Sequence, residues 1–227
     1  MNSRRIRIGH RGAAGYAPEN TLLSIDRALA LDVDFVEVDI QRTCDGHLVI
    51  LHDKRVDRTT NGQGYIAELT LNQARRLDAG GGQHIPTLPE VLETCSGRAG
   101  LMLELISEDI SSDVIAAIQR HKFHGSIIYA SFLHQEILSV RSINPGAATL
   151  VLMEAIPVNR TAFVQDARAN YAGLAFDSVR HQVINELHSN GVQVFVYTVN
   201  DPRDIELAVS WGVDGIISDY PDRIPHE

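Results

Sequence analysis

The sequence predicts an α/β protein of the (β/α)8 barrel class, with a small insertion after the second barrel strand. Three observations carry this prediction: short apolar runs alternate with amphipathic helical stretches, the apolar runs number eight, and the chain has 227 residues. Strands that alternate with helices form a parallel sheet, and a barrel of eight such units commonly has this length. We therefore expect residues 1–227 to form a single barrel domain.

The predicted strands are short apolar segments. They cover residues 6–9, 35–40, 101–106, 126–132, 149–154, 173–176, 192–199 and 215–218. The predicted helices lie between them, at residues 21–31, 88–95, 112–121, 134–143, 160–169, 182–189 and 202–211. Asp201 and Pro202 are typical of a helix start. Gly191 and Gly212 follow helices, where a left-handed residue is common.

One apolar segment does not fit this repeat. Residues 48–51 follow the pair Asp45-Gly46, which is typical of a hairpin turn. We expect an extra strand above the barrel, not a ninth barrel strand. Residues 54–86 are polar and rich in glycine, with one helical pattern at residues 71–78. We interpret them as an insertion over the barrel mouth.

Composition and charge narrow the range of functions. The formal net charge is −9, so a broad basic face for nucleic acid is not expected. The N-terminal residues carry charge without an apolar signal core, and no apolar run is long enough to span a bilayer. We expect a cytoplasmic protein without stable membrane insertion, and the sequence leaves its oligomeric state open.

Three carboxylates near strand ends indicate a metal site, because barrel active sites lie at the carboxyl ends of the strands. Strand alternation places Glu37 and Asp39 on one face, where they repel each other unless a cation lies between them. Glu104 interrupts an apolar strand, and a buried carboxylate needs a partner. One divalent ion would satisfy all three, and oxygen ligands favour Mg²⁺ or Ca²⁺, with Mn²⁺ also compatible. The alternative is that the acids form structural ion pairs with Arg or Lys.

Two histidines and an arginine lie close to these acids in the predicted barrel. His10 ends the first strand, and His52 follows the extra strand. Histidine gains or loses a proton near neutral pH, so the pair can serve as general acid and general base, in either order. Arg11 has a planar fork that matches phosphate oxygens. Together these residues indicate phosphodiester hydrolysis.

The chain resembles the glycerophosphodiester phosphodiesterases over nearly its whole length. The motifs that carry the resemblance are His10-Arg11-Gly12, Pro18-Glu19-Asn20-Thr21, Glu37-Val38-Asp39, Asp45-Gly46, His52-Asp53, Asp57-Arg58-Thr59-Thr60-Asn61-Gly62, Ser131-Phe132, Thr198-Val199-Asn200 and Asp214-Gly215-Ile216-Ile217-Ser218-Asp219-Tyr220-Pro221. Each motif alone is weak, and their order and spacing together make the match strong.

The resemblance implies metal-dependent cleavage of a small glycerophosphodiester, such as glycerophosphocholine, into glycerol 3-phosphate and an alcohol. It implies the following site residues: His10 and His52 as acid and base, Glu37, Asp39 and Glu104 as metal ligands, and Arg11, Asn20 and Tyr197 in contact with phosphate or substrate. Water could attack the phosphate directly, or a cyclic phosphate could form first. Tyr197 stands where the family usually has tryptophan, and it could equally be a core residue.

The sequence departs from the family pattern on the third barrel strand. The family usually has lysine where this chain has Ile106, so the cleft loses a positive charge. A competing function is therefore a phosphate-ligand-binding barrel that is non-catalytic or altered in specificity. A sugar-phosphate isomerase or aldolase also competes, with Lys54 as the one obvious lysine for it. A third competing function is a phosphodiesterase for lysophospholipids or phosphoinositides.

Overall fold

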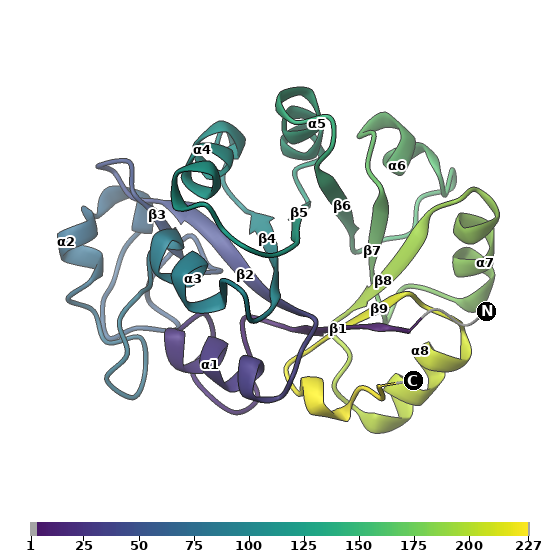
Figure 1. Ribbon diagram of the computed structural model, residues 1–227, viewed down its shortest axis with the longest axis horizontal. Helices are drawn as coiled ribbons and strands as arrows, with labels where there is room; N and C mark the ends of the chain where they lie inside the picture. The colour runs from purple at the N-terminus through teal and green to yellow at the C-terminus, as the bar shows by residue number, and fades with distance from the viewer. Residues whose placement is uncertain (1–3, 227) are drawn as a thin grey trace.

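Eight parallel strands close into a barrel in the computed structural model, which describes residues 4–226 (Figure 1). The barrel strands are β1 (Ile6–Gly9), β2 (Phe35–Arg42), β4 (Gly100–Leu105), β5 (Ile127–Ser131), β6 (Ala148–Met153), β7 (Tyr171–Ala175), β8 (Gln193–Tyr197) and β9 (Gly215–Ser218). The first strand closes the ring, because β1 pairs in parallel with both β2 and β9. All eight predicted strands are confirmed, and each end lies within two residues of its prediction.

Helices form a ring outside the strands (Figure 1). They are α1 (Leu22–Ala30), α3 (Leu88–Cys95), α4 (Ser111–His121), α5 (His134–Ile143), α6 (Ala162–Asp166), α7 (His181–Ser189) and α8 (Pro202–Ser210). The predicted caps are confirmed: the Asp201 side chain accepts a hydrogen bond at the start of α8, and Gly191 and Gly212 have positive φ. None of the helices within residues 4–226 is both long and apolar enough to cross a bilayer.

The helix α6 is shorter than the predicted segment 160–169. The Asn159 side-chain oxygen accepts hydrogen bonds from the backbone N–H groups of Thr161 and Ala162, so an Asx-type turn occupies the predicted first turn. Arg168 has a φ of 51°, a left-handed conformation that ends the helix. Side-chain competition for backbone groups therefore shortens this helix at its start, and a left-handed residue stops it.

The extra strand β3 (Leu48–Ile50) forms the predicted hairpin with β2. It runs antiparallel, with Ile40 opposite Ile50 and Arg42 opposite Leu48. This pairing carries β2 two residues beyond its predicted end. The insertion continues through the short 3₁₀ helix η1 (Ile66–Glu68) and α2 (Leu71–Ala74), and it lies on one side of the barrel (Figure 1).

The helix α2 ends four residues before the predicted end of segment 71–78. Asp78 turns the chain instead, because its backbone N–H donates to Asn61 and its carboxylate accepts from Gly80 and Gly82. A separate apolar cluster holds the insertion together: Val49, Leu51, Val56, Ile66, Ala74, Ala79 and Ile85. The insertion is therefore a packed layer with its own small core.

The core has an inner and an outer layer, as alternation along the strands requires. Side chains such as Val36 and Val38 of β2 pack outward against the helices. The inner cluster includes Ile8, Met102 and Phe195. Apolar residues fill most of the barrel interior, so inward-facing polar side chains gather at its carboxyl end.

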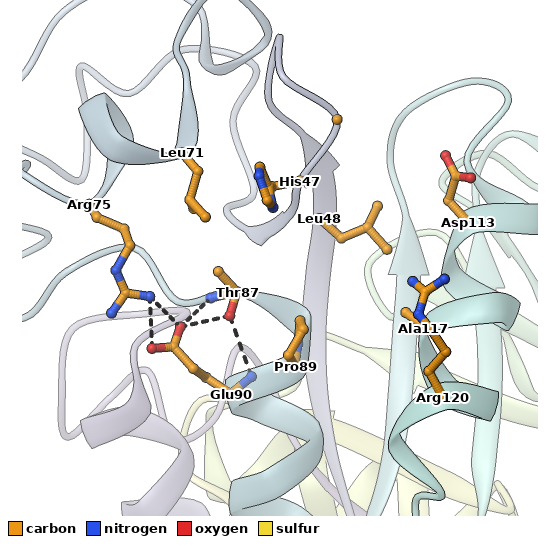
Figure 2. Close-up of a pocket in the computed structure, with 11 residues that line it drawn as sticks. His47, Leu48, Leu71, Arg75, Thr87, Pro89, Glu90, Asp113, Ala117 and Arg120 are labelled. Carbon is orange, nitrogen blue, oxygen red and sulfur yellow. Dashed lines mark hydrogen bonds and ion pairs between the residues drawn. The ribbon is translucent and has the colours of Figure 1, made fainter.

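A broad hollow lies outside the barrel, among β3, α2, α3 and α4 (Figure 2). Its Arg75 is bound by both carboxylate oxygens of Glu90, each at 2.8 Å. Glu90 also pairs with Thr87 in the capping box of α3. None of the predicted site residues lines this hollow.

Candidate active site

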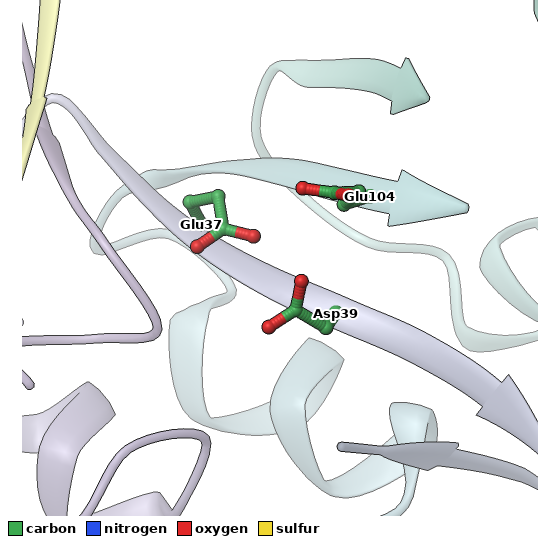
Figure 3. Close-up of side chains that lie close together, drawn as sticks. All are labelled: Glu37, Asp39 and Glu104. Carbon is green, nitrogen blue, oxygen red and sulfur yellow. The ribbon is translucent and has the colours of Figure 1, made fainter. Parts of the chain in front are cut away.

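Three carboxylates from two neighbouring strands meet at the barrel mouth. Glu37 and Asp39 lie on β2 and Glu104 on β4, and one oxygen from each lies within 4.8 Å of the others (Figure 3). The strand register causes this meeting, because Asp39 is directly opposite Glu104 and Glu37 lies two residues earlier on the same face. The cluster predicted from the sequence is therefore present as a geometric unit.

Because the three carboxylates are largely buried, their ionisation costs free energy when no cation is bound beside them. Burial raises the pKa of Glu37 well above its ordinary value, and the charges of Asp39 and Glu104 raise it further. Burial and Asp39 raise the pKa of Glu104 to about 8. The buried Oε1 atom of Glu37 has no hydrogen-bond partner among the described residues. A hard divalent cation fits such a set of oxygen ligands.

Arg11 and Asn20 come from the loop between β1 and α1 and lie against the cluster. The Arg11 backbone N–H donates to Glu37 at 2.7 Å, and its guanidinium Nε lies 3.4 Å from an Asp39 oxygen. Burial acts to lower the pKa of Arg11, but Asp39 and Glu19 outweigh burial and raise it, so the group stays charged. The Asn20 amide donates to Asp39 at 2.6 Å, so Asn20 is bound to a cluster carboxylate.

His10 is fixed by a carboxylate from the last strand of the barrel. Its Nδ1 lies 2.7 Å from Oδ1 of Asp219, which directly follows β9. Asn200 donates to the other Asp219 oxygen at 2.6 Å. An ionised carboxylate only accepts hydrogen bonds, so Nδ1 carries the proton and Nε2 is the ring nitrogen left for proton transfer.

His52, which lies just after β3, has the same arrangement. Its Nδ1 lies 2.7 Å from Oδ1 of Asp53, and Arg58 binds Asp53 through two nitrogens. The Gln41 amide donates to the carbonyl oxygens of Leu51 and His52, which ties the loop to β2. Because Nδ1 of His52 is bound to Asp53, Nε2 is the nitrogen left for proton transfer in this histidine as well.

Tyr197 ends β8 and lines a small cavity together with His10, Glu37 and Glu104. Its ring packs edge-on against Phe132, with ring centroids 5.9 Å apart. Burial raises the pKa of its hydroxyl, and the nearby acids raise it further. The hydroxyl is buried without a hydrogen-bond partner among the described residues. Both expectations for Tyr197 are thus compatible with its position, because the ring packs in the core and also borders the cavity.

Ile106 follows β4 directly and lines a hollow. Gln41, Lys54 and Tyr65 line the same hollow. Lys54 comes from the insertion and is exposed. A lysine from another segment therefore borders the hollow where the family usually has a lysine on the strand.

Sequence reasoning assigned no role to Asp219, Asn200 or Arg58. The signal for Asp219 was available, because it follows the last barrel strand as His10 follows the first. Arg58 had no such signal, since the fold of the insertion carries it to its partners Asp53 and Glu19.

The fold and the site together define an α/β barrel with an acidic cluster at its mouth. The family model described as the glycerophosphoryl diester phosphodiesterase family matches residues 10–223. The chain belongs to this family, as the resemblance predicted.

Individual relatives agree with the family match. The "Glycerophosphodiester phosphodiesterase" of Bacillus subtilis (strain 168) is 33% identical, with 96% of this chain and 85% of that protein covered. The "Probable glycerophosphodiester phosphodiesterase 1" of Mycobacterium tuberculosis (strain H37Rv) is 48% identical, with 95% and 89% covered. A solved Oleispira antarctica phosphodiesterase in complex with the product sn-glycerol-3-phosphate is 31% identical with a TM-score of 0.90, covering 97% of this chain and 94% of that chain.

Proposed function

We propose that the protein hydrolyses glycerophosphodiesters to glycerol 3-phosphate and an alcohol, in a metal-dependent reaction with His10 and His52 as acid and base. One observation carries the proposal: both histidines have Nδ1 bound to a carboxylate at 2.7 Å, and His10 lines a cavity together with Glu37 and Glu104 of the acid cluster. The product bound in the Oleispira antarctica phosphodiesterase supports the substrate class.

Glu37, Asp39 and Glu104 are the proposed metal ligands. The raised pKa values of Glu37 and Glu104 and the unpartnered Glu37 oxygen support this role. When bound there, a divalent ion supplies Lewis acidity and neutralises charge on a phosphate oxygen. Mg²⁺, Ca²⁺ and Mn²⁺ all suit oxygen ligands.

The remaining residues bind and orient in this proposal. Arg11 keeps its charge at the mouth and contacts the phosphate oxygens. Asn20 fixes the Asp39 carboxylate by its 2.6 Å hydrogen bond and so acts next to the phosphate. Tyr197 presents its ring edge to the glycerol or head group from the end of β8.

Proton transfer is assigned to the Nε2 atoms of the two histidines. A neutral imidazole takes the proton from the attacking hydroxyl or water, and a protonated imidazole gives one to the leaving alkoxide. Asp219 and Asp53 hold the two rings in the required tautomer and stabilise each ring when it is protonated.

The first test is release of glycerol 3-phosphate from glycerophosphocholine by purified protein with Mg²⁺, Ca²⁺, Mn²⁺ or EDTA. We expect metal-dependent release that His10→Ala lowers by about 100-fold to 10,000-fold. His121→Ala is the matched control, because His121 is an exposed residue in the last turn of α4. No release with any metal, from this substrate or from glycerophosphoethanolamine and glycerophosphoinositol, contradicts the proposal.

A binding-only or altered-specificity barrel is the second candidate, and Ile106 is the observation that favours it. If the missing charge limits phosphate binding, Ile106→Lys lowers KM and leaves kcat nearly unchanged. If Lys54 supplies that charge, Lys54→Met raises KM in the otherwise native protein. A protein that binds glycerol 3-phosphate without turning over any of these diesters would favour the binding role.

A further inference from the structure

Arg58 lies in the insertion, yet it binds two carboxylates next to the candidate site. Its Nε and Nη2 donate to Asp53 at 2.7 and 2.9 Å. Its Nη1 and Nη2 donate to Glu19 at 2.7 and 2.8 Å. We call these three residues the Arg58 clamp. The guanidinium of Arg58 thus forms two hydrogen bonds to each carboxylate. Because the group is planar and rigid, these paired bonds fix how the three side chains are oriented.

Each carboxylate of the clamp also holds one residue of the site. Asp53 uses Oδ1, the oxygen that Arg58 Nη2 reaches, to hold Nδ1 of His52 at 2.7 Å. Glu19 uses Oε1 to accept from Nη1 of Arg11 at 2.6 Å. A continuous chain of hydrogen bonds therefore runs from the imidazole of His52 to the guanidinium of Arg11, with Arg58 at its centre.

The charges along this chain of hydrogen bonds sum to zero when Arg58 is included. Glu19 and Asp53 contribute two negative charges, and Arg11 and Arg58 contribute two positive charges. Without Arg58, Glu19 would have Arg11 as its remaining cation and would hold it more strongly, in competition with a phosphate. Asp53 would lose the two contacts that fix its orientation toward His52.

We propose that Arg58 is a positioning residue that sets His52 and Arg11 in their working orientations from a single point on the insertion. This inference rests on the proposed function of those two residues. It assigns to the insertion a role in ordering the site.

A second arginine of the same segment provides a matched control. Arg55 forms an ion pair with Asp57 at 2.8 Å, and its guanidinium lies over the ring of Tyr65, 4.8 Å from the centroid. These contacts stay within the insertion and include none of the candidate site residues. If Arg58 only stabilised the insertion, Arg55→Gln and Arg58→Gln would have similar effects.

The experiment compares wild type with Arg58→Gln, Arg58→Lys and Arg55→Gln. It measures kcat and KM for glycerophosphocholine, the Kd for glycerol 3-phosphate, and the thermal unfolding midpoint. We expect Arg58→Gln to lower kcat/KM by about 10-fold to 100-fold, with kcat lower, KM higher and Kd weaker, at temperatures where the protein is folded. The kcat/KM of Arg58→Lys should lie between those of wild type and Arg58→Gln, because an ammonium keeps the charge but cannot form paired hydrogen bonds to both carboxylates. Arg55→Gln should match wild type in all three constants.

The outcomes separate this inference from the proposed function. If wild type hydrolyses the substrate and Arg58→Gln has the same kcat, KM and Kd as Arg55→Gln, the positioning role is overturned and the proposed function stands. A change in unfolding temperature alone also overturns it. If wild type neither hydrolyses a diester nor binds glycerol 3-phosphate, the proposed function fails and the inference fails with it.

Discussion

Glu104→Gln tests the electrostatic account of the acid cluster. Burial and Asp39 raise the pKa of Glu104 from an ordinary 4.5 to about 8, so the fold favours the protonated form. At about 1.4 kcal/mol per tenfold change in the proton equilibrium, ionising this group at pH 8 costs the metal-free fold on the order of 4 kcal/mol. A glutamine of nearly the same shape avoids that cost.

The raised pKa of Glu104 decides how the stability of the metal-free protein changes with pH. Between about pH 4.5 and 8 the folded protein holds a proton on Glu104 that the unfolded chain has released. The stability contribution is therefore complete below pH 4.5 and is lost as the pH rises toward 8. A divalent ion held by the proposed ligands would reverse this trend, because it would stabilise the ionised form and bind the folded protein.

The assay is urea unfolding of wild type and Glu104→Gln at pH 5 and pH 8, with EDTA or with Mg²⁺. In EDTA we expect Glu104→Gln to gain stability relative to wild type at pH 8 and little at pH 5. With Mg²⁺, wild type should gain more than the variant. Glu93→Gln is the control, because Glu93 is an exposed glutamate on α3. An unfolding free energy of the variant that equals wild type at pH 8 in EDTA would refute the reasoning.

Three further predictions concern residues that hold others in place. Asp219→Asn should lower kcat by about 10-fold to 100-fold, because His10 loses its ionised partner; unchanged steady-state kinetics would contradict this. Glycine at position 20 can keep the left-handed backbone of Asn20 (φ 58°). Asn20→Gly should weaken Mn²⁺ binding by about 10-fold to 100-fold in calorimetry, because Asp39 loses its amide partner. Equal affinity would show that Asn20 does not hold Asp39 for metal binding. Glu136→Gln should lower the free energy of unfolding in urea by about 1–3 kcal/mol, because the carboxylate accepts from three backbone N–H groups at the start of α4. A decrease below about 0.5 kcal/mol, which is the range of neutral surface changes, would count against this prediction.

The barrel and the acid cluster were predictable because both depend on local patterns. Alternation along a strand decides that Glu37 and Asp39 face inward. The parallel order of neighbouring strands then brings Glu104 beside them, once each strand is recognised as apolar. The same reasoning located His10 at the carboxyl end of the first strand.

The contacts between the site residues and their partners depend on long-range geometry: the sequence places Asp219 at the end of the last strand but does not show that it contacts His10. Asp219 reaches His10 from a position 209 residues away in the chain, and Arg58 reaches Glu19 across 39 residues. The bounds of α2 and α6 were wrong for a related reason. Asp78 and Asn159 use side-chain oxygens to bind nearby backbone N–H groups, a competition that hydrophobic periodicity does not register.

The hydrogen bond between His10 and Asp219 joins the carboxyl ends of β1 and β9, the strands whose pairing closes the barrel. A chain that has formed the first strands but has not yet docked the last one has an imidazole without its acceptor. Full activity should consequently appear only after β9 has paired with β1, so turnover measured after dilution from urea would report when the ring closes. Two fragments divided before β8 would each lack part of the site, and their mixture would recover full activity only as far as they reassemble the complete ring.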